Sequence, residues 1–83
     1  MGIRVRGFEY VPASATVKVG EKLSVPNADD APHTLTDRSD ARAFDSGTIK
    51  GGQTGEVSFG TPGTYAYFCE FHPFMKGSVT VTR

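Results

Sequence analysis

The sequence lacks several features that would place it in a common class of small protein. Its 83 residues include no tryptophan and a single cysteine. Because a disulfide needs two cysteines, none can form within the chain. Lysine and arginine together number nine, as do aspartate and glutamate, and this balance lacks the basic excess of a nucleic-acid groove. No apolar run is long enough to span a bilayer, and no signal peptide or anchor is recognisable. We therefore expect neither a nucleic-acid partner nor a membrane span in this chain.

Turn-forming residues are plentiful. Ten glycines and five prolines favour several short strands over a few long helices. The length suits a single domain over residues 1–83, which we expect to act as a monomer. A domain this small often needs an additional stabilising element, and with one cysteine the available candidate is a bound metal.

Apolar residues alternate with polar ones along several short segments, with a period of two rather than 3.6. This alternation is typical of half-buried strands, and glycine-containing turns separate the segments. The predicted strands are Ile3–Tyr10, Thr16–Val19, Lys22–Pro26, His33–Thr36, Thr54–Phe59, Thr64–Cys69 and Gly77–Thr82. They predict an all-β fold, an antiparallel sandwich or barrel of about seven to eight short strands. The polar stretch Asp37–Gly47 lacks the pattern, and we expect a surface excursion there.

The scarce metal-binding side chains gather near the C-terminus. Cys69, His72 and Met75 are spaced three residues apart and include the only cysteine and the only internal methionine. Pro73 disfavours helical backbone at the residue before it, so we expect the three side chains on a tight loop and not on a helix. The other histidine, His33, can close the site if its strand lies beside the Cys69 strand.

One thiolate, two imidazoles and one thioether form a donor set that discriminates among metals. Structural zinc usually takes four cysteine or histidine ligands, and iron–sulfur clusters need several cysteines. A weak axial thioether beside a thiolate and two imidazoles suits copper that alternates between Cu(I) and Cu(II). The predicted ligands of one copper ion are His33, Cys69, His72 and Met75.

Other interpretations of these residues use fewer of them. Cys69 alone could be an inert buried thiol, and Met75 alone could fill a gap in the core. Cys69 and His72 could also form a nucleophile and its base, but such pairs are usually distant in sequence and oriented by a third group. Since that leaves Met75 and His33 without a role, we expect no catalytic residue and no enzymatic activity.

The metal loop and two upstream segments resemble a known family. Residues 63–77, together with Val17–Glu21 and Asn27–Thr34, are similar to segments of the cupredoxins. The two-residue gap between His72 and Met75 is like that of amicyanin, so the chain is identified as an amicyanin-like or plastocyanin-like cupredoxin. The resemblance implies a Greek-key β-sandwich with one type 1 (blue) copper site.

The resemblance also implies a function. It is single-electron transfer between redox partner proteins in transient encounters, and we expect it in the periplasm, outside the cell or at the cell surface. The alternative is a copper-binding module for storage, delivery or sensing, or a domain cut from a larger exported copper protein.

The sequence departs from these relatives beside the ligands. Thr34 stands where they typically have asparagine. Its backbone N–H can still donate to the Cys69 thiolate, but we expect the tie that the asparagine side chain makes between the two ligand segments to be lost. Phe71 stands where they commonly have proline, so we expect its N–H to give the sulfur a second hydrogen bond and to raise the reduction potential.

Four apolar residues flank the ligands on loops: Pro32, Phe71, Pro73 and Phe74. Exposed together, they would form a patch around His72 suited to brief docking of redox partners. In the alternative, Phe74 plugs the end of the barrel. Other aromatic residues are expected in the core: Phe8, Phe59, Tyr65 and Tyr67. Most of a set of charged residues are expected to form a solvated rim: Asp29, Asp30, Asp37, Arg38, Asp40 and Arg42.

Overall fold

The computed structural model describes residues 2–38 and 44–83 and shows eight short strands in them. The strands are β1 (Arg4–Arg6), β2 (Glu9–Val11), β3 (Ser14–Lys18), β4 (Lys22–Pro26), β5 (Thr36–Asp37), β6 (Thr54–Ser58), β7 (Gly63–Phe68) and β8 (Lys76–Thr82). The described residues contain no helix, and so none long and apolar enough to cross a membrane. The predicted all-β fold is confirmed.

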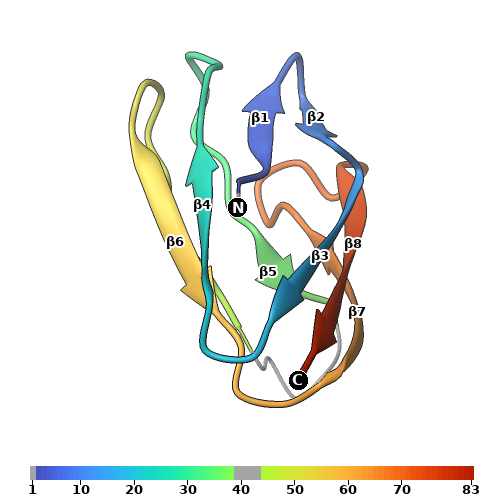
Figure 1. The fold of residues 1–83 in the computed structure, drawn as a ribbon. Coiled ribbons are helices and arrows are strands. Elements are labelled where there is room, and N and C mark those ends of the chain that lie inside the picture. The colour runs from blue at the N-terminus through green and yellow to red at the C-terminus, as the bar shows by residue number, and fades with distance from the viewer. Residues whose placement is uncertain (1, 39–43) are drawn as a thin grey trace.

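The strands form two layers around a shared core (Figure 1). In one layer the order is β3-β8-β7-β5, with β3 parallel to β8 and the other pairs antiparallel. In the other, β4 pairs antiparallel with β6, and bridges at Gly2–Ser24 and Val5–Asn27 join the β1–β2 hairpin to β4. The parallel β3–β8 pair departs from the purely antiparallel arrangement that the sequence predicts.

In most of the strands, the period-two pattern of the sequence matches the face that is buried. Val17, Leu23 and Val79 are buried, while their neighbours along each strand are exposed or half-buried. Removal of such side chains from water stabilises the fold by roughly 25 cal/mol per Å² of apolar surface. Phe59 and Tyr67 belong to this core, as predicted, and Tyr65 packs against it.

The first predicted strand, Ile3–Tyr10, is divided into β1 and β2 by a tight turn. Gly7 and Phe8 have φ angles of 62° and 60°, the left-handed pair that a two-residue hairpin turn requires. The turn places the Phe8 side chain outside the core, 41% exposed. The expectation that Phe8 is a core residue was therefore wrong, because a phenylalanine in a left-handed conformation is uncommon and gives no turn signal.

The segment from His33 onward differs from the prediction. Only Thr36 and Asp37 form a strand, and the register pairs Thr36 with Phe68 of β7. His33 instead exchanges backbone hydrogen bonds with Ile49. This segment lies beside the Cys69 strand, as closure of the predicted site requires.

The predicted surface excursion Asp37–Gly47 is wrong at two positions. Asp37 is a buried strand residue, so its expected place in a solvated rim was wrong as well. Phe44 is buried with its ring edge against Phe59, 4.9 Å between centroids. Residues 39–43 of that stretch lie outside the described residues.

Candidate metal centre

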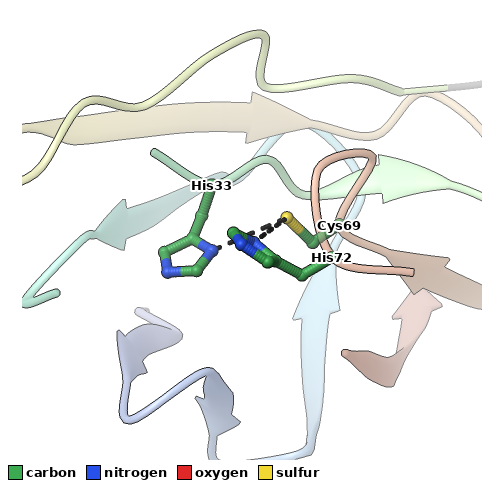
Figure 2. A group of neighbouring side chains, drawn as sticks. All are labelled: His33, Cys69 and His72. Carbon is green, nitrogen blue, oxygen red and sulfur yellow. Dashed lines mark hydrogen bonds between the residues drawn. The ribbon is translucent and has the colours of Figure 1, made fainter. Parts of the chain in front are cut away.

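Three donor atoms from two segments that are distant in sequence converge at one end of the sandwich. The ligating atoms of His33, Cys69 and His72 all lie within 4.8 Å of one another. The Cys69 Sγ is 3.6 Å from Nδ1 of His33 and 3.9 Å from Nδ1 of His72. Figure 2 shows both rings with a nitrogen turned toward the sulfur. The two imidazoles therefore present the same ring nitrogen to a common point.

The loop between β7 and β8 folds back on itself. Cys69 directly follows β7, and its backbone N–H donates to the Met75 carbonyl at 3.3 Å. The Met75 N–H in turn donates to the His72 carbonyl at 2.9 Å. Met75 is only 2% exposed, so the loop holds its thioether inside the protein. No helix forms in this loop, as Pro73 after His72 predicts.

His33 is fixed at both its backbone and its ring. Its backbone pairs with Ile49, and its Nε2 lies 2.9 Å from a carboxylate oxygen of Asp29. An ionised carboxylate can only accept a hydrogen bond, so Nε2 carries a hydrogen, and in the neutral imidazole Nδ1 then has its lone pair free toward Cys69. A carboxylate partner on the outer nitrogen is the usual way in which proteins orient a metal-binding histidine.

Asp29 contacts a predicted ligand, His33, and the sequence prediction did not include it in the site. Its carboxylate also accepts the backbone N–H groups of Gly7 at 2.7 Å and Phe8 at 2.9 Å. Burial by itself would raise the pKa of Asp29, but these two N–H donors and the His33 ring outweigh it and hold the pKa below its ordinary value. The assignment of Asp29 to a solvated rim was therefore wrong.

Two hydrogen bonds from Thr34 tie the His33 segment to the Cys69 loop. The Thr34 N–H donates to the Cys69 Sγ at 3.4 Å, and the Thr34 Oγ1 accepts the Glu70 N–H at 3.0 Å. The expected loss of this tie was wrong, because the threonine hydroxyl accepts the hydrogen bond across the two segments. Within the described residues, Phe71 makes no hydrogen bond to the sulfur, so the second donor that we expected there does not form.

Phe8 packs against both imidazoles. Its ring meets His33 edge-to-face at 5.3 Å between centroids and His72 at 5.0 Å. The hairpin turn that moves Phe8 out of the core thus places it over the site, and Asp29 holds both the turn and His33. Packing of this kind restricts the rotation of the two rings.

The apolar residues around His72 are exposed together. Phe74 and Phe71 are 67% and 50% exposed, and Pro32 and Pro73 are exposed as well. Phe74 therefore does not plug the end of the sandwich. Its ring lies 6.1 Å from that of His72 and 6.5 Å from that of Phe8. We name the set of five exposed residues the apolar patch: Phe8, Pro32, Phe71, Pro73 and Phe74.

The donor set fits copper better than the common alternatives. A cysteine sulfur and two imidazole nitrogens lie together, and the buried thioether of Met75 lies in the loop that carries Cys69 and His72. Soft sulfur together with imidazole suits Cu(I) and Cu(II), whereas structural zinc usually requires a fourth cysteine or histidine. The described part of the chain offers no further cysteine or histidine for that purpose.

Comparisons with known proteins agree with this chemistry. The family model for copper binding proteins of the plastocyanin/azurin family matches residues 1–82. Amicyanin-alpha of Methylorubrum extorquens is 29% identical over 82 residues, covering 95% of this chain and 69% of the relative. Amicyanin of Paracoccus versutus is also 29% identical, and there the chain spans only 62% of the relative's length.

A plant protein and a solved structure are also similar to this chain and belong to the same class of copper proteins. Plastocyanin A/B of Petroselinum crispum is 34% identical over 86 residues, which cover 90% of this chain and 89% of the relative. The structure of the Cu(I) form of an amicyanin mutant superimposes with a TM-score of 0.87 at 30% identity, covering 98% of this chain and 80% of that one.

The contact between Asp29 and His33 gives a testable prediction. We expect Asp29→Ala to lower copper affinity by roughly 10- to 100-fold, because His33 loses the acceptor that orients it. The measurement is a competition titration against a chelator. Asp30→Ala is the matched control, since it removes the same charge from the exposed neighbouring residue. Equal affinities for the two variants would contradict the role of Asp29.

Proposed function

The chain belongs to the plastocyanin/azurin family of copper-binding proteins, and on that premise we propose that it carries single electrons between redox partner proteins. Proteins of the amicyanin and plastocyanin type transfer electrons and transform no substrate of their own. The proposed ligands of its one type 1 copper ion are His33, Cys69, His72 and Met75. The observation that carries the proposal is the convergence of a buried cysteine sulfur and two imidazole nitrogens within 4.8 Å.

Bound copper supplies the one-electron chemistry by alternating between Cu(I) and Cu(II). The protein's part is to hold the donor atoms in one arrangement. Asp29 orients His33, the Thr34 N–H donates to the sulfur, and Phe8 packs against both rings. A site held from several sides rearranges little when its charge changes, and this favours rapid electron transfer.

We propose that partners dock on the apolar patch and that electrons pass through His72. The support is the exposure of the patch around a half-buried histidine ring. Small apolar surfaces of this kind suit short-lived complexes. We further propose that residues 1–83 form one copper-binding domain, monomeric, in the periplasm or outside the cell.

Electron self-exchange tests the proposed function directly. Mixtures of the Cu(I) and Cu(II) forms should show NMR lines that broaden in proportion to the concentration of the oxidised form, because two copies exchange electrons through their patches. The alternative, a copper storage or delivery module, predicts slow electron exchange and rapid exchange of isotopically labelled copper between copies. That second result would overturn the proposal.

The docking surface has its own test. We expect Phe74→Lys to slow self-exchange by about 10-fold or more at low ionic strength, because it places like charges on both facing patches. Added salt should restore part of the rate by screening. The control is Val19→Lys, at a residue that is 39% exposed in the turn between β3 and β4, at the other end of the sandwich (Figure 1). Equal rates for both variants would exclude docking on the patch.

A further inference from the structure

A chain of polar contacts leads from the Cys69 loop to a residue outside the metal centre. The Glu70 N–H donates to Thr34 Oγ1 at 3.0 Å, and Thr34 Oγ1 lies 2.9 Å from Thr36 Oγ1. Thr36 Oγ1 lies 3.1 Å from Oδ1 of Asp45. Both threonines are buried, and residues two apart along an extended segment project to the same side, so their hydroxyls meet. Asp45 Oδ1 also accepts the Gly47 N–H at 2.8 Å.

The hydrogens in this chain can be assigned by counting them. Each hydroxyl has one hydrogen, and an ionised carboxylate only accepts. Thr36 must therefore donate to Asp45 and has no second hydrogen for Thr34. It follows that Thr34 donates to Thr36 and accepts from the Glu70 N–H. Every hydrogen then points the same way, from Glu70 toward Asp45.

The opposite direction of donation, from Thr36 to Thr34, leaves the Thr34 hydroxyl hydrogen without an acceptor among these groups. If Thr36 donated to Thr34, the Thr34 oxygen would receive two hydrogens, and its own would find none of these groups to accept it. A buried hydroxyl hydrogen without an acceptor destabilises the fold. The Asp45 carboxylate thus selects one of two orders, and aligned hydrogen bonds strengthen one another.

We propose that Asp45 is a positioning residue for the metal centre, acting through Thr36 and Thr34. The proposal rests on the proposed copper site for its functional meaning. Thr34 is the junction: its N–H reaches the Cys69 sulfur, its carbonyl accepts the Tyr10 hydroxyl, and its own hydroxyl holds the Glu70 N–H. A fixed hydroxyl at Thr34 therefore fixes the start of the Cys69 loop relative to the His33 segment.

Amide hydrogen exchange in the metal-free protein tests whether these hydrogen bonds connect Glu70 to Asp45. We expect Asp45→Ala to speed exchange of the Glu70 amide by about 10-fold or more relative to the Val79 amide, which reports the stability of the core. Asp30→Ala is the control for charge removal and should leave this ratio unchanged. A ratio unaltered by Asp45→Ala would overturn the proposal, because a merely local role would change only groups near Gly47.

A double-variant cycle shows whether Asp45 and Thr36 act on the Glu70 amide through connected hydrogen bonds or independently. Thr36→Val removes the middle link, so adding Asp45→Ala to it should speed Glu70 exchange no further, whereas Thr36→Ser should keep the protection. Thr48→Val, at an exposed threonine, is the matched control. Additive effects of Asp45→Ala and Thr36→Val would contradict a connected chain.

Copper release distinguishes this inference from the proposed function. We expect Asp45→Ala to release copper to a chelator several-fold faster than Asp30→Ala. If the unaltered protein bound no copper, the proposed function would fail, and Glu70 exchange would still decide whether the chain exists. If Asp45→Ala retained copper as the control does, the positioning role would be excluded even with faster Glu70 exchange.

Discussion

The arrangement at this end of the molecule depends on the burial of one cysteine sulfur, that of Cys69, between two imidazoles. Cys69 is fully buried, and polar groups taken out of water must find partners or destabilise the fold. The sulfur accepts the Thr34 N–H and faces both Nδ1 atoms. Because Thr34 and His33 lie 35 and 36 residues from Cys69 in sequence, the two layers of strands must first bring these segments together.

The residues that surround the Cys69 sulfur are in turn held by residues farther from it. Asp29 binds His33 and also the turn at Gly7 and Phe8. Phe8 then packs on the rings of both histidines. The hairpin and the histidines are thus parts of one arrangement, and a change in the turn would alter the packing around both histidine rings. Asp29 and Phe8 each make two of these contacts, and in this way a chain of only 83 residues holds a well-defined site.

The sequence predicts the regular parts of this protein and misses the contacts made across the fold. The strand Lys22–Pro26 agrees with β4, and the spacing of Cys69, His72 and Met75 predicts their common loop. Period-two patterns and scarce ligand types are local signals, so a single sequence reveals them. Asp29 gives no such signal: its partners Gly7 and Phe8 lie 22 and 21 residues away. The hydroxyl of Thr34 gives no local signal either, since its partner Glu70 is 36 residues away.

The central claim is that these residues bind copper through the Cys69 thiolate. The most direct measurement is the visible spectrum of the metal-free protein during titration with Cu(II). We predict an intense thiolate-to-copper band that grows to one equivalent and gives a blue protein, and that is absent from Cys69→Ser. A protein that stays colourless after one equivalent, or a band of equal intensity in Cys69→Ser, would contradict the account.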